Sequence, residues 1–515
     1  MIRFVRVLAG LISVLSATAC SGPSLDLEKH RVVILVVDGL RPDYVTAALM
    51  PRLNRLAERG VRGLAHHAVF PTVTRVNGPS IFTGRYPGGH GLLGNSVYLP
   101  EVDATRVLDM SDRDDVVAID EATGGALLTA PSLGELLDAQ GVTYFAASSG
   151  STGSATFMNH RGAGVGLVHR EFTLPPELGG VVAETLGPVP DIPEGSNAVP
   201  LVARTVDALL LLGVDRFDAD VMAGWLTEPD GTAHGTGIGS PETVEALAGV
   251  DAEIGRLIDG LAARGVLGHT DILVTSDHGF TTETGSTSLS ALLVDAGLKE
   301  GPRSTDVVVA GGAIHVREGG SERVGAIVRV LQATDWVGAV FTRGDSASGL
   351  GARPGTVAFS AIGWDHERSA DILVSPNWSD EENEFGFRGE VSAPGVAGHG
   401  SASPWDIHAT LVVDGPSIKD FISSPVPTGN VDILPTLLAI LGVPLPSDLD
   451  GRVLTEVLED GPFPAEVQFE PDILEVAAQV DGAGYDLSVY RTRVGSTVYL
   501  DGFDVVRTPP PGGAP

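Results

Sequence analysis

The sequence predicts an α/β fold: a doubly wound, mostly parallel sheet with helices on both faces, and a smaller inserted α+β lobe. Continuous apolar runs at residues 32–37 and 272–274 indicate strands that are buried on both faces. Helical and strand patterns alternate along most of the chain, as in βαβ units. The chain has 515 residues, of which 43% are hydrophobic, and this is enough for a large core.

The individual elements follow from apolar periodicity and from the residues that end helices. A helix at residues 43–59 would place Leu49, Leu53 and Leu56 on one side and stop at Gly60. The other expected core helices are residues 132–139, 198–212, 241–264 and 433–441. The expected core strands are residues 31–37, 142–147, 220–226 and 271–275.

Two regions fall outside this alternating pattern. The inserted lobe is expected at residues 285–385, with a strand near 307–316 and a helix near 322–332. Residues 456–515 predict a C-terminal β extension of short strands, with a hairpin around Asp501-Gly502 and a frayed end.

The N-terminal segment has the pattern of an export signal. Residues 1–19 place two arginines before an apolar run that is too short to span a bilayer. Cys20, the only cysteine, follows the expected cleavage point and resembles the lipid-bearing cysteine of a bacterial lipoprotein. We expect an exported, membrane-anchored lipoprotein that faces the periplasm or the cell exterior, with a tether at residues 20–30 and a main domain at residues 31–455.

The charge of the chain excludes one class of partner. Asp plus Glu number 66 and Lys plus Arg number 33, so the formal net charge is −33 at pH 7. Such a chain does not bind DNA, RNA or anionic lipid through a general basic surface. A small anionic substrate would have to be drawn in locally, for example by bound metal.

The stretch at residues 70–95, FPTVTRVNGPSIFTGRYPGGHGLLGN, predicts a hydroxyl nucleophile. Thr74 stands where a helix can begin. The unpaired N–H groups and partial positive charge of a helix start attract anions such as phosphate and stabilise an alkoxide. A threonine at this position is also a common helix cap, so its role depends on residues elsewhere in the chain.

Six Asp and His residues follow predicted strands or glycine turns and can converge on this threonine, because ligand sites in open α/β sheets lie beyond the carboxyl ends of the strands. The ligands expected for one divalent ion are Asp38, Thr74, Asp277 and His278. Those expected for a second divalent ion are Asp230, His234 and His399. Three carboxylates and three imidazoles without sulfur best suit zinc, with manganese or iron as weaker options.

Two metal ions beside a hydroxyl form a clamp for in-line displacement at phosphorus. Coordination would activate the weakly nucleophilic Thr74 hydroxyl, so that a covalent phospho-threonine forms and is then hydrolysed. The Asn95 amide and the backbone N–H after Thr74 could donate to the non-bridging oxygens. Each residue alone also has a structural interpretation as a turn or strand-end residue, and the prediction rests on the joint pattern.

These motifs together resemble the alkaline phosphatase superfamily, and within it the nucleotide pyrophosphatase/phosphodiesterase family. The resemblance covers residues 31–445 and rests on VVDG at Asp38, PTVTRVN followed by TGRYPGGHG and Asn95, Asp230 with His234, DHG from Asp277, and GHGSASPWDIHATLVVDGP around His399. It implies an alkaline phosphatase-like catalytic domain, two zinc ions and a threonine nucleophile. It also implies that Asn95 donates to a phosphoryl oxygen, where other phosphatases use an arginine.

One departure from the family concerns the substrate. Relatives that cleave nucleotides carry an aromatic residue directly after the nucleophile to stack the base, whereas this chain has Arg75. Arg75 is expected to pair with a second anionic group of the substrate, such as a carboxylate, sulfate or distal phosphate, or else to be a solvated helix residue.

The sequence therefore predicts a two-zinc hydrolase that cleaves phosphodiester or related phosphoryl bonds of a small phosphorylated substrate through Thr74. Phosphonate, phosphomonoester and sulfate-ester hydrolysis are alternatives on the same scaffold. A formylglycine-type sulfatase is disfavoured because that residue is made from Cys or Ser in a different motif. A non-catalytic surface lipoprotein that binds phosphorylated ligands is a more distant alternative, since such a protein would be free to lose site residues and none is missing.

Overall fold

The computed structural model describes residues 26–510. The expected signal peptide at residues 1–19, Cys20 and the first part of the tether lie outside the described residues. Within residues 26–510, no helix combines the length and the apolar character that crossing a membrane requires.

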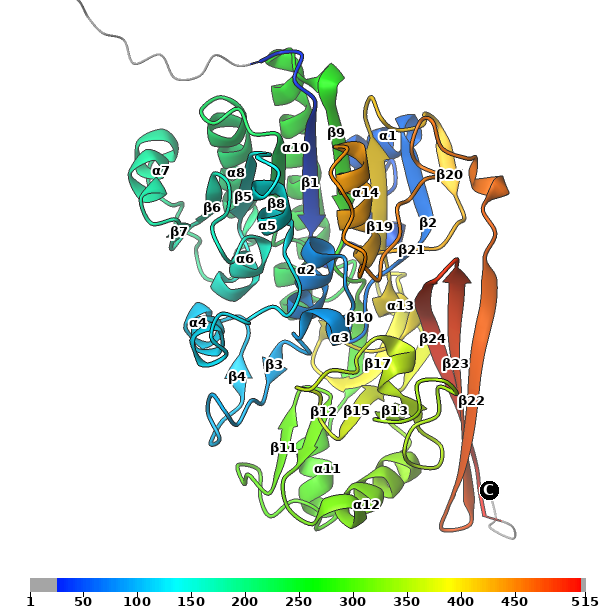
Figure 1. Ribbon diagram of the computed structural model, residues 1–515. Coiled ribbons are helices and arrows are strands. Elements are labelled where there is room, and N and C mark those ends of the chain that lie inside the picture. Colours follow the sequence, from blue (N-terminus) through cyan, green and yellow to red (C-terminus); the bar gives the residue numbers. More distant parts are fainter. Residues whose placement is uncertain (1–25, 511–515) are drawn as a thin grey trace, which may run out of the picture.

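A ten-stranded sheet forms the core of the molecule (Figure 1), with the strand order β20-β2-β19-β9-β1-β8-β5-β6-β7 and β21 paired to β2. Its strands are β1 (Arg31–Val37), β2 (Val61–His67), β5 (Tyr144–Ser148), β6 (Gly166–His169), β7 (Thr173–Leu174), β8 (Val221–Leu226), β9 (Thr270–Thr275), β19 (His408–Asp414), β20 (Ile422–Ser424) and β21 (Thr428–Gly429). The central strand β1 pairs in parallel with β8 and β9, whereas β19 runs antiparallel to β9 and β2. The predicted mostly parallel, doubly wound fold class is confirmed.

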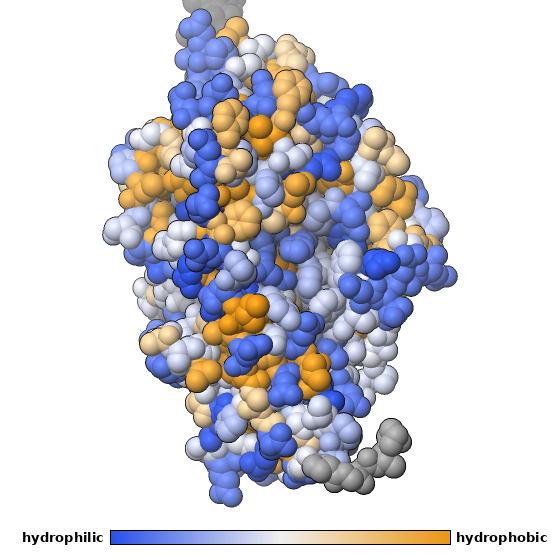
Figure 2. Space-filling model, turned by 90° about the vertical axis from the view of Figure 1, so that its right-hand side faces the viewer, coloured by the Kyte–Doolittle hydropathy of each residue, from blue (hydrophilic) through white to orange (hydrophobic). Residues whose placement is uncertain are grey.

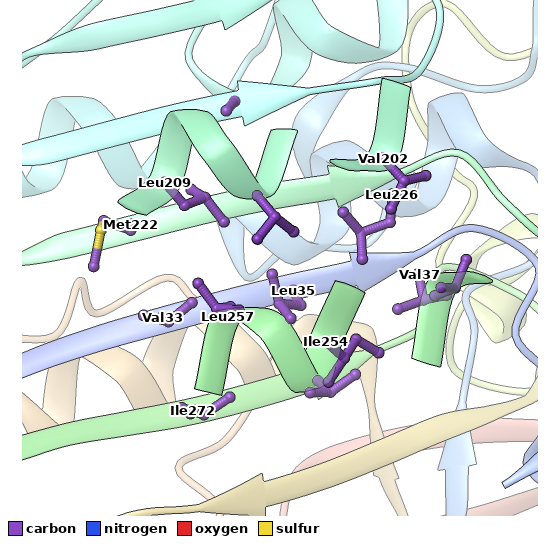
Figure 3. Close-up of a cluster of buried hydrophobic side chains, with 14 of the residues drawn as sticks. Val33, Leu35, Val37, Val202, Leu209, Met222, Leu226, Ile254, Leu257 and Ile272 are labelled. Carbon is purple, nitrogen blue, oxygen red and sulfur yellow. The ribbon is translucent and has the colours of Figure 1, made fainter. Parts of the chain in front are cut away.

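Helices cover both faces of this sheet because both faces of β1 are apolar. Val33, Leu35 and Val37 pack on one side against helices α1, α8 and α10. Figure 3 shows the contacts with α8 and α10. Val32, Ile34 and Val36 belong to the core on the other side, with α2, α5, α6 and α14. These helices are α1 (Pro51–Arg59), α2 (Thr74–Thr83), α5 (Leu133–Asp138), α6 (Thr152–Met158), α8 (Val199–Asp207), α10 (Pro241–Ala263) and α14 (Ile433–Ile440).

Shorter elements fill the connections. The further helices are α3 (Pro87–His90), α4 (Arg113–Ala122), α7 (Leu178–Leu186), α9 (Asp230–Thr236) and α13 (Pro404–Ile407). The two short strands β3 (Ser96–Val97) and β4 (Leu108–Asp109) pair with each other. A π-helical turn at Ala208–Val214 continues α8.

The expected helix at residues 43–59 is wrong in its first half. Pro42–Tyr44 forms only a 3-10 turn, and the α-helix begins at Pro51. The residue before a proline is disfavoured in the helical region, and Met50 accordingly has a φ of −133° and a ψ of 67°. Pro51 therefore sets the start of α1.

Two smaller sheets lie beyond the carboxyl end of β1 (Figure 1). One contains β11 (Val307–Ala310), β12 (Ala313–Val316), β13 (Val337–Thr342), β14 (Val357–Ala358) and β15 (Ile372–Pro376), with helices α11 (Leu289–Asp295) and α12 (Gly320–Ala333). The other contains β10 (Thr281–Gly285), β16 (Trp378–Glu382), β17 (Arg388–Pro394) and β18 (Ala397–Gly398). The single strand expected at residues 307–316 is instead the hairpin β11–β12, because the chain reverses at Gly311-Gly312. The domain boundaries drawn from the sequence stay predictions.

The C-terminal extension is a sheet of three long strands, β22 (Glu470–Val480), β23 (Ala483–Val494) and β24 (Thr497–Thr508). The expected short strands and the hairpin at Asp501-Gly502 are wrong. The two turns lie instead at Asp481-Gly482 and at Gly495-Ser496. Asp481 and Gly482 have φ angles of 51° and 85°, as a two-residue hairpin requires. Gly502 lies inside β24 beside a break in register, where a glycine often marks a bulge.

Parts of both faces of this C-terminal sheet pack against the rest of the protein: Phe503 belongs to one core cluster and Tyr499 to another. The Tyr499 hydroxyl donates to the Asp432 carboxylate at 2.7 Å, while Ile473 and Val506 are exposed. Figure 2 looks onto this side of the molecule and shows hydrophobic residues mixed with hydrophilic ones.

Truncation of Leu257 tests how much the helix-covered face of the core sheet contributes to stability. Leu257 is fully buried in the cluster of Figure 3. We expect Leu257→Ala to lower the free energy of unfolding by about 2–5 kcal/mol through lost contacts and a residual cavity. Urea denaturation measures this change. Glu245→Ala, an exposed position on the same helix α10, is the control and should be nearly neutral. Equal effects of the two substitutions would contradict the assignment of this core.

Candidate active site

The carboxyl ends of three neighbouring strands bring the predicted acidic residues together. Asp38 directly follows β1, Asp277 follows β9, and Asp230 begins helix α9 just after β8. Because β1 lies between β8 and β9 in the sheet, residues far apart in the sequence become neighbours at this edge.

Gly39 allows the three segments to approach closely. It has a φ of 70°, and its N–H donates to Asp277 Oδ1 at 3.1 Å. A Cβ atom at this position would lie 3.2 Å from the Cβ of Asp230 and 3.0 Å from the Phe280 ring. A side chain would therefore strain the turn and crowd the neighbouring carboxylate.

The imidazoles face the carboxylates at distances slightly longer than a good hydrogen bond. Asp230 Oδ1 lies 3.3 Å from Nε2 of both His234 and His399. His278 Nε2 lies 3.1 Å from Asp277 Oδ2 and 3.5 Å from Asp38 Oδ1. All three of these carboxylate oxygens are buried without a well-formed hydrogen bond.

The three histidines share one orientation. In each ring Nδ1 contacts a backbone carbonyl oxygen. The pairs are His234 with Ala397, His278 with Gly279, and His399 with Thr72. A carbonyl oxygen can only accept, so Nδ1 must carry a proton in each ring, and a neutral ring then has its lone pair on Nε2. These three Nε2 atoms therefore point into the site as potential metal ligands.

The groups of this cluster shift one another's pKa values in opposite directions. Burial and the Asp277 and Asp230 carboxylates raise the pKa of Asp38 well above its usual value. Burial alone would lower the pKa of His278, but the Asp277 carboxylate outweighs it and raises that pKa. In Asp230 burial is outweighed by the imidazoles of His234 and His399, so its pKa is lowered. A metal ion would have to displace protons from such a site, so its affinity should rise with pH.

Thr74 is the first residue of helix α2 and lies at the edge of this cluster. Its side chain is buried, and Thr74 Oγ1 lies 3.3 Å from His278 Nε2. The hydroxyl thus combines the positive end of a helix with a set of imidazole and carboxylate groups.

Asn95 contacts the start of the same helix. Its side-chain Oδ1 accepts a hydrogen bond from the Arg75 backbone N–H at 3.0 Å. This differs from the expectation that the backbone N–H after Thr74 donates to a phosphoryl oxygen, because Asn95 already occupies that donor. The contact fixes the amide orientation and leaves the Asn95 Nδ2 group as the donor available to a ligand.

The Arg75 side chain is half-buried and only partly paired. One terminal nitrogen donates to Ser151 Oγ at 3.0 Å, while Nε is buried and has no hydrogen-bond partner within residues 26–510. Its positive charge also lowers the pKa of Asp38, though less than burial and the two carboxylates raise it. Arg75 therefore presents an unsatisfied cation close to the carboxylate cluster.

These residues form two groups that fit metal ions. The ligand atoms of Asp230, His234 and His399 lie within 4.8 Å of one another, as do those of Asp38, Asp230 and His278. The unpaired carboxylate oxygens and the inward Nε2 atoms supply nitrogen and oxygen donors of the type that zinc prefers. Asp230 belongs to both groups, whereas the sequence assigned it to one ion.

A third group with potential ligands lies apart from this site. It consists of His67, His408 and Asp501, and joins β2 and β19 to β24. His67 Nε2 lies 2.8 Å from Asp501 Oδ1, which is a direct hydrogen-bond distance and shorter than the 3.1–3.5 Å contacts of the candidate active site. We interpret it as an ion pair or hydrogen bond that holds the C-terminal sheet.

Several supporting residues were not predicted from the sequence. Trp225 Nε1 donates to Asp38 Oδ2 at 2.9 Å and so orients this carboxylate. Asn430 donates to the Asp277 carbonyl at 2.9 Å and to Asn77 at 3.0 Å, which ties helix α2 to the end of β9. Asn77 occurs three residues after Thr74 in the quoted motif, and this spacing is the only sequence signal for the network.

Comparison with known families and relatives agrees with this geometry. A family model described as type I phosphodiesterase / nucleotide pyrophosphatase matches residues 32–377. The chain is 27% identical over 271 residues to a venom phosphodiesterase of Macrovipera lebetinus, covering 51% of this chain and 27% of that protein. It is 25% identical over 260 residues to ectonucleotide pyrophosphatase/phosphodiesterase family member 3 of Mus musculus, covering 50% and 25% respectively. The matched segments span about a quarter of the length of these relatives.

Solved structures share the fold. Murine ectonucleotide pyrophosphatase/phosphodiesterase 5, in complex with AMP, superposes with a TM-score of 0.57 and 17% identity, covering 81% of this chain and 96% of that one. A variant of the alkaline phosphatase PafA superposes with a TM-score of 0.63 and 16% identity, covering 84% and 99%. Proteins named as phosphodiesterases and as phosphatases share this fold, so the fold alone does not distinguish between these reactions.

Removal of the Trp225 hydrogen bond tests the proposed orientation of Asp38. We expect Trp225→Phe to weaken binding of divalent metal by about 10- to 100-fold, the usual effect of losing a partner that orients a ligand. Competition with a chromogenic chelator at fixed pH measures this affinity. Trp378→Phe is the control, because it removes an indole hydrogen bond to the carbonyl oxygen of Phe503, outside the site. A Trp225→Phe protein that binds metal as tightly as this control would refute the role.

Proposed function

Because this chain belongs to the type I phosphodiesterase / nucleotide pyrophosphatase family, we propose that it is a metal-dependent hydrolase of phosphodiester or related phosphoryl bonds. The observation that carries this proposal is the position of Thr74, whose hydroxyl oxygen lies at a helix start and 3.3 Å from His278 Nε2. A hydroxyl in this setting can attack a phosphorus atom that is held by the same helix start.

The reaction proceeds in two displacements. Thr74 Oγ1 loses its proton and attacks phosphorus, and the P–O bond to one alcohol breaks, so that this alcohol leaves after taking up a proton. Water then attacks the phospho-threonine, which releases the phosphomonoester and restores the Thr74 hydroxyl. Both steps are in-line, so attacking and leaving groups occupy opposite sides of phosphorus.

We assign two divalent metal ions, best suited by zinc, to the Asp and His cluster. The residues that would hold them are Asp38, Thr74, Asp277 and His278 for one ion, and Asp230, His234 and His399 for the other. Such ions activate the nucleophile and neutralise charge on the oxygens of the transferred group. The fixed Nδ1–H tautomers of the histidines keep their Nε2 atoms ready for this role.

Asn95 is the assigned donor to a non-bridging phosphoryl oxygen. Its Oδ1 accepts from the Arg75 backbone N–H, so the Nδ2 group is the part of the amide that can donate to a bound ligand. A neutral amide donor suits a diester, whose transferred group carries less negative charge than that of a monoester.

Arg75 is the assigned binding residue for a second anionic group of the substrate. The buried, unpaired Nε and the exposed share of the guanidinium leave donors for a carboxylate, sulfate or distal phosphate. This position lacks the aromatic residue that would stack a nucleotide base.

Phosphonate, phosphomonoester and sulfate esters remain alternative substrates on the same scaffold. A panel of aryl phosphodiester, aryl phosphate, aryl phosphonate and aryl sulfate separates these reactions. The family assignment and Asn95 favour the diester. A non-catalytic binding protein is disfavoured because every predicted site position is filled and Thr74 lies against the cluster.

We further propose that the protein is exported and acts on small phosphorylated molecules outside the cytoplasm. The names of the venom and ectonucleotide relatives agree with export. Anchoring through a lipid on Cys20 rests on the N-terminal sequence pattern. The net charge of −33 is unfavourable for a general nucleic-acid surface.

Substitution of the nucleophile tests the reaction. We expect Thr74→Ala to lower kcat on bis(p-nitrophenyl) phosphate by about 10⁴-fold or more, while metal content stays unchanged, because only the attacking oxygen is lost. Steady-state kinetics and elemental analysis provide the two measurements. Thr83→Ala, in the last turn of the same helix, should keep near-normal activity. Full activity of Thr74→Ala would exclude this residue as nucleophile.

Substitution of Arg75 tests the second anionic subsite. We expect Arg75→Gln to lower kcat/KM by about 10- to 100-fold on a substrate with a distal phosphate, because a charge-assisted pair is lost. The loss on bis(p-nitrophenyl) phosphate, which has no second anionic group, should be threefold or less, in the range of a lost neutral contact. Arg75→Lys should recover part of the loss. Equal losses on both substrates would instead place Arg75 on the transferred phosphoryl group.

A further inference from the structure

A cavity of about 390 Å³ opens beside the candidate active site. Asn95 and His399 form its border with the site, and residues of both the inserted lobe and the main domain line the rest. A cavity of this size is in the range of small-molecule sites. It lies between the strand ends of the core sheet and the sheet that contains β11, β12 and β15, so the two parts of the chain build it together.

The walls of this cavity are mainly apolar. The side chains that give it this character are Leu93, Leu289, Val309, Trp336, Val374 and Pro376. Leu289 and Trp336 are half-buried, so each has surface that faces the cavity as well as the core of the lobe. An apolar group that enters the cavity would therefore leave water for a hydrocarbon environment.

The charges around the cavity oppose an anionic occupant. Its lining includes no lysine and no arginine, and its acidic residues are Glu283 and Asp406. Asp406 is buried, and one of its oxygens accepts from the Ser401 hydroxyl at 2.6 Å. Arg75 and Ser151 do not line the cavity, so the anion-binding side chain lies elsewhere around the site.

We propose that this cavity binds a neutral, apolar alcohol group of the substrate, so that the enzyme prefers amphiphilic phosphodiesters. One ester substituent, an alkyl chain, enters the cavity of the lobe. The other, polar or anionic, contacts Arg75. This inference rests on the proposed phosphodiesterase function and specifies its substrate class.

A series of p-nitrophenyl alkyl phosphates with methyl, butyl and octyl groups tests the proposal. Each buried methylene should raise kcat/KM by about two- to fourfold until the cavity is filled, as expected for hydrophobic transfer. The octyl ester should therefore be a much better substrate than the methyl ester. Equal kcat/KM values along the series, with the methyl ester still hydrolysed, would overturn the cavity assignment and leave the phosphodiesterase function intact.

Two matched substitutions locate the effect in the cavity. Leu289→Trp adds bulk to the cavity wall and should reduce the octyl-to-methyl ratio of kcat/KM by about fourfold or more, the effect of excluding two or more methylenes. Leu292→Trp lies on the same helix α11 and contacts the same lobe core, but it does not line the cavity. It should leave the ratio unchanged. The same change of ratio in both variants would show a general disturbance of the lobe and overturn the assignment.

A binding measurement separates the cavity from the chemistry. Calorimetry with metal-loaded Thr74→Ala should show tighter binding of the octyl than of the methyl diester, and Leu289→Trp in this background should remove the difference. Tighter octyl binding without turnover by the wild-type protein would support the cavity and refute the proposed hydrolysis. Equal binding of both diesters would refute the cavity.

Discussion

The mutual repulsion of three adjacent carboxylates, two of them buried, is the constraint on which the rest of the site depends. Asp38, Asp230 and Asp277 meet because β1, β8 and β9 are adjacent parallel strands that end at the same edge. Burial and its two carboxylate neighbours raise the pKa of Asp38, so this arrangement is costly without compensating positive charge. The histidines and the proposed metal ions supply that charge. The partial positive charge at the N-terminus of helix α2, which begins at Thr74, adds to it.

The surroundings of the cluster hold its groups in place through backbone contacts. Each candidate metal-binding histidine donates its Nδ1–H to a main-chain carbonyl, which leaves Nε2 unprotonated in the neutral ring. Asn95 is oriented in the same way, through its contact with the Arg75 N–H. Because backbone groups of a packed core move little, the chemistry-bearing atoms are positioned before a ligand binds.

The two sides of the site differ in character, and this difference links fold to specificity. Arg75 contacts helix α6 through Ser151 and offers positive charge. The inserted lobe offers an apolar cavity without basic residues. A phosphodiester has two ester substituents, so a site with one charged side and one apolar side can distinguish both the identity and the orientation of its substrate.

The sequence by itself determined the fold class, the strand-end acidic residues and the threonine at a helix start, because these depend on local periodicity and on residue type. Two local predictions were wrong: α1 begins only at Pro51, because the residue before this proline is not helical, and Asp501-Gly502 lies inside β24, because pairing with β23 outweighs its turn preference. Only the tertiary structure decided that Asp230 lies in both ligand groups, that Trp225 orients Asp38, and that the lobe closes a cavity beside Asn95. These features join residues from different strands and sheets. The order of residues along the chain contains no signal for the distances between such residues.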